Sequence, residues 1–346
     1  MINLNTESIK NYPFTAIVGQ EDMKKALILN IINPSIGGVL IRGEKGTGKS
    51  TAVRSIVDLL PRREEVENCI LSCDPLDLSK MCEECRSKVN AGERLEAREG
   101  KMKVIELPIN ATEDRVAGTL DIQTAIKRGE KKFEPGILAF ANRNILYIDE
   151  INLLEDHIVD ILLDAAAMGV NNIEREGISY AHPSRFILVG TMNPEEGDIR
   201  PQLIDRFGLV VDVIGEKNNE NRIEVINRRM RYENDPEAFI KSFERENNEL
   251  AGKIISAKNI LSQVTYGDDI LEATVGICIK LDLDGHRGDI TAIKTAATIA
   301  AFNGRTIVTK EDLAEALKFV IPHRMRKRPF EEGNLDITVI HELLEN

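Results

Sequence analysis

The sequence predicts an α/β fold, a parallel sheet flanked by helices, followed by a smaller all-helical C-terminal domain. Between about residues 12 and 215, short apolar runs alternate with helical patterns, as in a series of βαβ units. After residue 215, charged and helical patterns replace the apolar runs. At 346 residues the chain is long for a single core, so two domains are the better expectation.

Five apolar runs are expected to form the strands of the sheet. They are short and rich in branched residues, as strands buried on both faces should be. They lie at 39–42, 104–107, 145–148, 186–190 and 209–214.

Helices are expected in the remainder of the chain. Residues 218–262 are highly charged and predict one or two long solvated helices. Near the C-terminus, Thr309 and Asp312 form a capping-box pattern. The apolar face that follows ends before Pro322 and consists of Leu313, Ala316, Leu317, Val320 and Ile321.

The composition excludes several classes of protein. The net charge of −12 counts against general affinity for nucleic acid, although a basic run at 323–328 could meet an acidic partner or, less favourably, nucleic acid. The helical run at 158–170 is interrupted by Asp160 and Asp164, so no membrane span is expected. The N-terminus shows no secretory signal pattern. A cytoplasmic protein is therefore expected.

Residues 43–50, Gly-Glu-Lys-Gly-Thr-Gly-Lys-Ser, fill every fixed position of the phosphate-binding pattern G-x-x-x-x-G-K-[ST]. The motif lies between an apolar run and a helical pattern, as a P-loop requires, whereas a plain glycine turn would not need the Lys-Ser pair. Lys49 is expected to reach the β- and γ-phosphates, and the Ser50 hydroxyl to bind Mg²⁺. The residues expected to hold ATP here are Gly43, Glu44, Lys45, Gly46, Thr47, Gly48, Lys49, Ser50 and Thr51.

Hydrolysis also requires acids at the ends of neighbouring strands. The run at 145–148 is followed by Asp149 and Glu150. Asp149 is expected to hold the Mg²⁺ of MgATP, and Glu150 to polarise the attacking water as a general base. Asn193 follows the next strand and could orient that water, or could merely cap the turn before Pro194.

Two arginines are further candidates for catalysis. Arg206, held by a paired Asp, is typical of a finger offered to the γ-phosphate of a neighbouring subunit, with a surface salt bridge as the alternative. Arg287, in a Gly-His-Arg-Gly-Asp loop, could lie over the same nucleotide and report its state.

Further segments accompany these motifs: Tyr-Pro-Phe-Thr-Ala-Ile-Val-Gly-Gln at 12–20, Ala-Thr-Glu-Asp-Arg-Val-Ala-Gly at 111–118, Phe-Glu-Pro-Gly at 133–136, Arg-Glu-Gly-Ile at 175–178 and Gly-Thr-Met-Asn-Pro-Glu-Glu at 190–196. Together they resemble the ATPase I subunit of magnesium chelatase. That AAA+ protein is closely similar to the small ATPase subunit of cobaltochelatase. The resemblance extends over almost the whole chain.

The resemblance implies specific roles and partners. It makes Asn193 sensor 1, Arg206 a finger acting in trans and Arg287 sensor 2, and it places Val18 in the adenine pocket. It implies a ring, expected to be a hexamer, stacked on a D subunit and driving a large H-type subunit that holds the porphyrin. The expected domains are an AAA+ domain at 1–215 with an insertion at 62–103, a helical linker at 216–262 and a helical domain at 263–346.

The insertion contains Cys69, Cys73, Cys82 and Cys85, spaced C-x₃-C-x₈-C-x₂-C. Reduced thiols at this spacing suit a tetrahedral Zn²⁺ site. An iron–sulfur cluster and unligated surface thiols are the alternatives. The fifth cysteine, Cys278, is expected to pack in the core.

Three functions share these motifs. The favoured one is an ATP-hydrolysing chelatase motor that drives insertion of Mg²⁺ into protoporphyrin IX, or of Co²⁺ in the cobaltochelatase case. The second is a general AAA+ protein-remodelling ATPase, which would not require the segments at 111–118 and 175–178. The third is a nucleic-acid translocase, against which the net charge counts.

Overall fold

The computed structural model describes residues 11–120, 133–175, 178–197 and 199–325. Its centre is a five-stranded parallel sheet. The strand order is β11 (Leu209–Val213), β1 (Val39–Gly43), β10 (Ile187–Met192), β7 (Ile145–Ile148) and β4 (Val104–Leu107). Each of the five expected runs forms one of these strands, with ends that differ by at most two residues. The predicted parallel sheet is confirmed.

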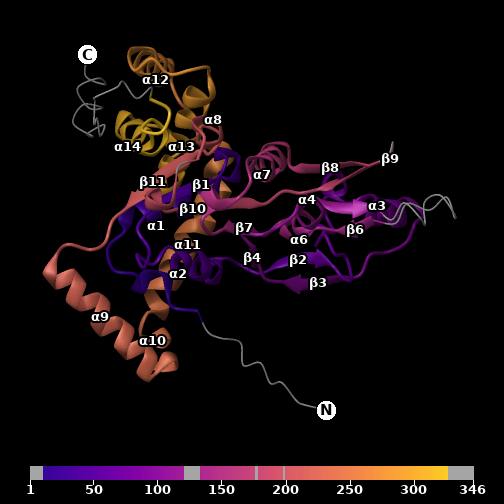
Figure 1. The fold of residues 1–346 in the computed structure, drawn as a ribbon, viewed down its shortest axis with the longest axis horizontal. Helices are drawn as coiled ribbons and strands as arrows, with labels where there is room; N and C mark the ends of the chain where they lie inside the picture. Colours follow the sequence, from indigo (N-terminus) through magenta and orange to yellow (C-terminus); the bar gives the residue numbers. More distant parts are fainter. Residues whose placement is uncertain (1–10, 121–132, 176–177, 198, 326–346) are drawn as a thin grey trace.

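Helices cover both faces of this sheet (Figure 1). Successive residues of a strand point to opposite faces, and accordingly Val39 and Ile41 belong to one apolar cluster while Leu40 belongs to another. The first cluster includes α1 (Glu21–Ile32) and α2 (Lys49–Ile56). The second includes α6 (Ile137–Ala141), α7 (Asp156–Met168) and α8 (Pro201–Ile204).

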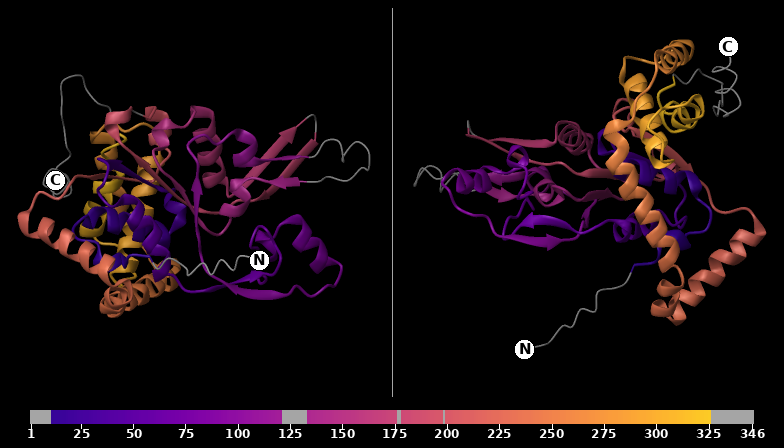
Figure 2. Two further views of the ribbon diagram at one scale, coloured as in Figure 1. Left: turned by 60° about the horizontal axis from the view of Figure 1, so that its bottom comes forward. Right: turned by 180° about the vertical axis from the view of Figure 1, so that it is seen from behind.

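Three two-stranded antiparallel ribbons extend from one end of the sheet (Figures 1 and 2). They pair β2 (Arg63–Val66) with β3 (Ala97–Gly100), β5 (Gly118–Leu120) with β6 (Phe133–Pro135), and β8 (Val170–Arg175) with β9 (Ile178–Pro183). Helices α3 (Glu83–Asn90) and α4 (Glu113–Ala117) lie in this region, and α3 belongs to the expected insertion at 62–103. Part of the 175–178 segment, residues 176–177, lies outside the described residues.

Short 3₁₀ helices complete the connections between these elements. They are η1 (Phe14–Ala16), η2 (Pro34–Ile36), η3 (Val57–Leu59), η4 (Leu78–Lys80), η5 (Ile151–Leu153), η6 (Pro194–Glu196) and η7 (Leu261–Gln263).

The charged segment after β11 forms three helices instead of the expected one or two. They are α9 (Asn219–Asn234), α10 (Pro236–Ser242) and α11 (Glu244–Ile260). Asp235 separates the first pair, because its side chain caps α10 at the backbone N–H of Ala238 and Pro236 begins that helix. No residue of α9 is buried, and α9 projects away from the sheet (Figures 1 and 2).

The C-terminal helices are α12 (Asp268–Lys280), α13 (Arg287–Phe302) and α14 (Lys310–Val320). The capping box between Thr309 and Asp312 is present, and all five residues of the expected apolar face are buried, so the prediction for this helix is confirmed. These helices share one apolar cluster with α1 and the sheet. Within the described residues, the apolar core therefore continues from the sheet into the C-terminal helices, and the domain boundaries remain a prediction.

The basic run at 323–328 differs from expectation in its described part. Arg324 is buried, and it donates hydrogen bonds to Asp205 Oδ1 (3.1 Å) and to the carbonyl oxygens of Phe207 (2.6 Å) and Gly208 (3.2 Å). Burial lowers the pKa of Arg324 to about 10. This arginine therefore fixes the C-terminal helices to the end of α8, and its charge is not available to an external partner.

Candidate nucleotide-binding site

The P-loop follows β1 and leads into α2, and its backbone conformation depends on glycine. A side chain at Gly43 would place a Cβ 1.9 Å from the carbonyl oxygen of Val213 in the neighbouring strand. Gly48 has a φ of +83°, in the left-handed region that glycine adopts without steric cost. Only glycine fits both positions, and α2 begins directly afterwards at Lys49. The N-terminus of α2 is thereby directed at the loop, as anion binding requires.

The two lysines of the loop have different partners. Lys49 Nζ donates to the carbonyl oxygens of Gly43 and Glu44, the latter at 2.9 Å. Burial lowers the pKa of Lys49, while the nearby Asp149 and Glu150 act in the opposite direction. Lys45 Nζ forms ion pairs with Glu196 Oε1 (2.5 Å) and Glu150 Oε1 (3.3 Å), and these hydrogen bonds raise the pKa of Lys45.

Asp149 follows β7 and is held by two neighbouring hydroxyl groups. Its Oδ1 accepts hydrogen bonds from Thr191 Oγ1 (2.6 Å) and Tyr147 Oη (2.9 Å). Burial, as the largest cause, raises the pKa of Tyr147 to about 12, whereas a hydrogen bond with Ser50 acts to lower it. Ser50 and Asp149 therefore flank the same tyrosine. A hydroxyl and a carboxylate beside a phosphate-binding loop are oxygen ligands of the kind that Mg²⁺ prefers, so these residues fit the metal of MgATP.

Glu150 is fixed through its backbone. Its φ of +52° and ψ of +53° lie in the left-handed region, which costs about 1–2 kcal/mol for a residue with a side chain. The backbone N–H of Glu150 donates to Thr191 Oγ1 at 3.1 Å. Thr191 thus contacts both acids, and the strained turn directs the Glu150 carboxylate towards Lys45 of the P-loop.

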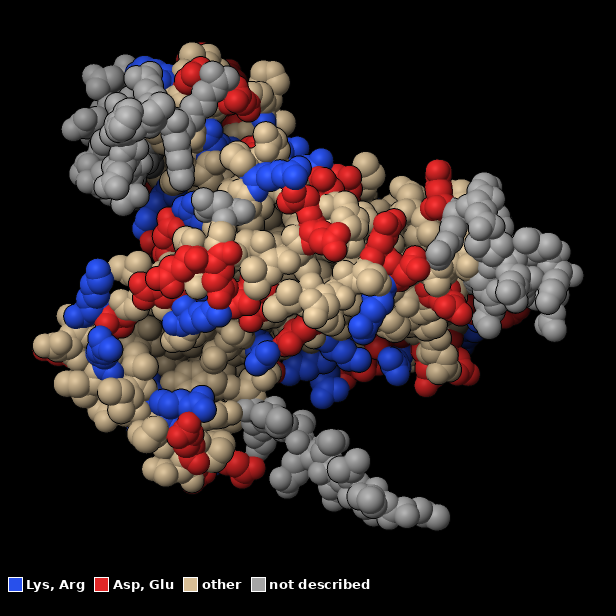
Figure 3. Space-filling model, in the orientation of Figure 1, with Lys and Arg blue, Asp and Glu red and all other residues tan. Residues whose placement is uncertain are grey.

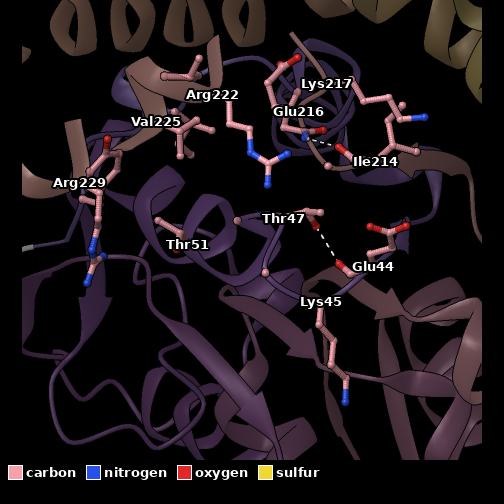
Figure 4. A pocket seen from close by; sticks show the side chains of 17 residues that line it. Glu44, Lys45, Thr47, Thr51, Ile214, Glu216, Lys217, Arg222, Val225 and Arg229 are labelled. Carbon is pink, nitrogen blue, oxygen red and sulfur yellow. Dashed lines mark hydrogen bonds between the residues drawn. The ribbon is translucent and has the colours of Figure 1, made fainter. Parts of the chain in front are cut away.

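A cavity of about 610 Å³ lies between the P-loop and α9 (Figure 4). A cavity of this size is typical of a small-molecule site. Arg222 and Arg229 reach into it from α9, and Lys45 extends from the other side of the P-loop (Figure 4). The expected nucleotide-binding residues that line it are Val18, Glu44, Lys45, Gly46, Thr47, Gly48 and Thr51. Gly43, Lys49 and Ser50 adjoin these residues in the chain but do not line this cavity.

Asn193 lies at the end of β10, between the P-loop strand and the strand that carries the acids. It is buried, and its Oδ1 accepts a hydrogen bond from the Glu195 backbone N–H at 3.3 Å. The turn-capping alternative is therefore realised in the structure. A role for Asn193 in orienting water remains a prediction.

Arg206 and Arg287 both lie near Asp205: Arg206 follows it in the chain, and Arg287 is paired with it. Arg206 forms ion pairs with Asp164 (2.7 Å) and Asp160 (3.1 Å) of α7. Asp205 instead pairs with Arg287 (2.6 Å) and with the buried Arg324. Neither Arg206 nor Arg287 lines the cavity next to the P-loop. Asp205 holds the Arg287 guanidinium at the end of α8, and a role for Arg287 over the nucleotide remains a prediction.

The sulfur atoms of the four cysteines of the insertion lie close to one another, and none of these cysteines lines the cavity. Cys278 is buried on α12, which confirms the core position expected for it, and burial raises the pKa of its thiol to about 12.

Several residues of the site were not foreseen from the sequence. Thr191 could have been found from strand order, because Gly190 pairs with Ile148 and the next residues must then be neighbours. Glu196, which pairs with Lys45, and the α9 arginines that reach the cavity carry no motif of their own. Their positions depend on tertiary structure.

Charges of both signs are mixed on the molecular surface. On the face shown in Figure 3, acidic side chains are widely spread and basic ones lie among them. Within the described part of the chain, no helix is both long enough and apolar enough to cross a membrane.

The parallel sheet of this strand order, the P-loop, the acids after β7 and the helices after residue 262 define the class of protein, an AAA+ ATPase. Two family models agree: an AAA domain of the dynein-related subfamily matches residues 89–207, and an AAA lid domain matches residues 271–343.

Comparison with known proteins defines the family. The chain is 59% identical to a magnesium-chelatase subunit ChlI homologue of Methanocaldococcus jannaschii, covering 96% of this chain and 90% of that protein. It is 49% identical to the magnesium-chelatase subunit ChlI of Synechocystis, covering 92% and 90%. The chain belongs to the ChlI family of magnesium-chelatase subunits.

Solved structures agree with this assignment. A chain in a model of the complex between subunits BchI and BchD of magnesium chelatase, based on cryo-electron microscopy, is 43% identical, with a TM-score of 0.55 and coverage of 96% of this chain and 99% of that one. The crystal structure of a protein from Cytophaga hutchinsonii has a TM-score of 0.60 at 16% identity, with coverage of 96% of this chain and 91% of that one, and supports the fold alone.

Proposed function

We propose that the protein is the ATP-hydrolysing motor subunit of a metal chelatase, which drives insertion of Mg²⁺ into protoporphyrin IX in the synthesis of chlorophyll-type tetrapyrroles. The observation that carries this proposal is the joint presence of a P-loop cavity, two acids held by Thr191, and a separate pair of arginines, in a chain 59% identical to a ChlI homologue.

The residues that act on the nucleotide of their own chain lie around the P-loop. Lys49 neutralises phosphate charge, and Ser50 and Asp149 hold Mg²⁺, which offsets the charge that develops on the phosphate oxygens. Glu150 accepts a proton from the attacking water. The water oxygen then bonds to the γ-phosphorus, and the bond between the γ-phosphorus and the leaving oxygen of ADP breaks. Asn193 positions that water. Val18 contributes to the adenine pocket.

The remaining charge is supplied by another copy of the chain. Arg206 and Arg287 both lie beside Asp205 and outside the cavity lining. We assign both to the nucleotide of the adjoining protomer, where an arginine in trans stabilises the charge of the transition state. Head-to-tail contacts form a ring when the rotation between copies closes, so that every site is completed by a neighbour, and we propose a hexamer.

The proposed partners are a D subunit, stacked on the ring, and a large H-type subunit that holds the porphyrin. The D subunit is proposed because a chain of the BchI–BchD complex is 43% identical to this one.

The cofactors are ATP and Mg²⁺. We place the protein in the cytoplasm, where ATP is available. Zinc takes no part in this reaction, because the four cysteines lie outside the cavity lining.

The test is a reconstitution of the full-length protein with D and H-type subunits, ATP, Mg²⁺ and protoporphyrin IX. Metal insertion is followed by porphyrin fluorescence. Glu150→Gln should retain ATP binding but lose about 100-fold or more in hydrolysis and insertion, because the base is absent. Glu155→Gln, on an exposed carboxylate outside the site, is the matched control.

The same assay separates the alternatives. Insertion of Co²⁺ into a corrinoid precursor, and none of Mg²⁺ into protoporphyrin, would replace this function by that of a cobaltochelatase. Hydrolysis without insertion of either metal would contradict a chelatase motor and favour a general protein-remodelling ATPase.

A further inference from the structure

The insertion brings four thiols into one cluster that the nucleotide chemistry does not use. Cys69 and Cys73 follow β2, Cys82 caps α3 and Cys85 lies in its first turn. The four Sγ atoms all lie within 4.8 Å of one another, and Cys73, Cys82 and Cys85 are buried. Thiolates at about 2.3 Å from a tetrahedral Zn²⁺ are about 3.8 Å apart, so only a small contraction separates this cluster from a zinc site.

Backbone groups already point at the sulfur atoms. The Cys82 N–H lies 3.1 Å from Cys73 Sγ, and the Cys85 N–H lies 3.4 Å from Cys82 Sγ. N–H groups directed at sulfur favour the thiolate, which is the form that binds metal. Such donors also orient the ligands of a metal site.

Basic side chains outnumber acidic ones in a hollow next to the cluster. Lys80, Arg86, Arg185 and Glu83 line this hollow beside Met81, the residue before Cys82, and Lys80 is paired with Asp77. Four thiolates around one Zn²⁺ carry a net charge of −2, and neighbouring cations stabilise such a site.

The insertion is small enough to need a stabilising cross-link in addition to its apolar core. Residues 62–103 form a segment of about 40 residues, near the size below which a core alone is rarely sufficient. Its β2–β3 ribbon is not joined to the central sheet, and a lone two-stranded ribbon is marginally stable. Three of the cysteines are themselves the core of the insertion, where they pack with Val66, Leu71, Met81 and Ala139. A metal at the cluster would tie the β2 end of the insertion to α3.

The geometry also discriminates between the alternatives. An iron–sulfur cluster places several iron and sulfide atoms between its thiolates, whereas these thiols are mutually close. Disulfides would join the sulfurs in two separate pairs, but each sulfur here is close to the other three. We infer that Cys69, Cys73, Cys82 and Cys85 bind one Zn²⁺ ion as a structural tetrathiolate site.

The zinc site has a defined connection to the rest of the molecule. Asn142 Nδ2 donates to the Leu71 carbonyl oxygen (2.7 Å), and Arg143 Nη1 donates to the Ser72 carbonyl oxygen (2.9 Å). Both residues precede β7, the strand that leads to Asp149. The loop between Cys69 and Cys73 is thereby fixed to the sheet, and loss of the metal should loosen the insertion while leaving the P-loop able to bind nucleotide.

The test is metal analysis of the full-length protein purified without chelator. About one equivalent of zinc and little iron per chain is expected, and Cys85→Ser should lose most of the zinc. Cys278→Ser, which alters a buried thiol outside the cluster, should retain it. Less than about 0.1 equivalent of zinc in the wild-type protein, iron with sulfide, or two disulfides detected by mass would overturn the proposal.

A second measurement does not depend on the stability of a variant. Protein produced with Co²⁺ in place of Zn²⁺ should show the visible absorption of tetrahedral cobalt bound to thiolates. Cobalt bound with a spectrum typical of oxygen ligands would contradict the assignment. ATP binding should be retained in Cys85→Ser, so failure of the zinc proposal is distinguishable from failure of the proposed chelatase function.

Discussion

Thr191 is the residue on which both acids of the site depend. Its hydroxyl donates to Asp149 Oδ1 at 2.6 Å and accepts from the Glu150 backbone N–H at 3.1 Å. One side chain thereby fixes the carboxylate that we propose binds Mg²⁺ and the strained turn that carries the proposed base. Thr191 does not line the cavity, so it acts by positioning these groups.

Thr191→Val keeps the shape of the side chain but removes both hydrogen bonds. We expect ATP hydrolysis to fall about tenfold, since roughly 1–2 kcal/mol of positioning is lost. The Mg²⁺ concentration needed for half-maximal activity should rise, which a purely structural defect would not cause. Thr191→Ser, which retains the hydroxyl, should remain near wild type. Equal behaviour of the Val and Ser variants would disprove the positioning role.

At the scale of elements, the β8–β9 ribbon contains a buried histidine whose charge state is fixed by its neighbours. His182 Nε2 is 3.0 Å from Asn171 Nδ2, and the same amide nitrogen donates to the Ala117 carbonyl oxygen at 2.8 Å. His182 Nε2 must therefore accept, while Nδ1 donates to the Pro183 carbonyl oxygen at 3.0 Å. Burial lowers the pKa of His182, and the ring is neutral in the folded protein.

This arrangement predicts a pH-dependent stability. In the unfolded chain the histidine has an ordinary pKa of about 6.5 and takes up a proton below that pH, whereas the folded ribbon disfavours the protonated ring. The contribution of neutral His182 to the free energy of unfolding is therefore fully present above about pH 6.5 and is lost as the pH falls below it. His182→Gln keeps an acceptor for Asn171 but cannot titrate. Between about pH 7.5 and about pH 5.5, the melting temperature should fall about 2 °C more in the wild type than in this variant.

The comparison with the variant isolates this histidine from other groups. The half-buried His323 also has a lowered pKa, and it contributes equally to both proteins. An identical loss of melting temperature in wild type and His182→Gln would exclude His182 as a source of the acid sensitivity.

The sequence predicts elements where a local pattern determines them. Short runs of branched residues gave all five strands, and Thr309 with Asp312 gave the start of α14. Arg324 was misjudged, because its burial follows from carbonyl groups that the end of α8 presents to it from far away in the chain. The same limit applies at the site, where Thr191 and Glu196 become partners of motif residues only through the sheet.

At the scale of the whole molecule, the proposed mechanism gives one chain two incomplete parts of a catalytic site. The P-loop lines the cavity and Glu150 pairs with its Lys45, while Arg206 pairs with α7 and Arg287 pairs with Asp205. Ion pairs with Asp160, Asp164 and Asp205 hold these arginines in place. A head-to-tail ring would bring the two parts together at every contact between copies.

The most direct test mixes two inactive variants. Lys49→Ala removes the phosphate-binding lysine of its own site, and Arg206→Ala removes the arginine given to the neighbour, so each protein alone should be nearly inactive. In a randomly mixed ring, about a quarter of the contacts join an intact P-loop to an intact arginine. A mixture of Lys49→Ala with Glu150→Gln, whose defects lie on the same side of the contact, is the matched control. The account predicts recovery of about a quarter of wild-type ATP hydrolysis in the first mixture and none in the control; no recovery in the first mixture would contradict a site shared between copies.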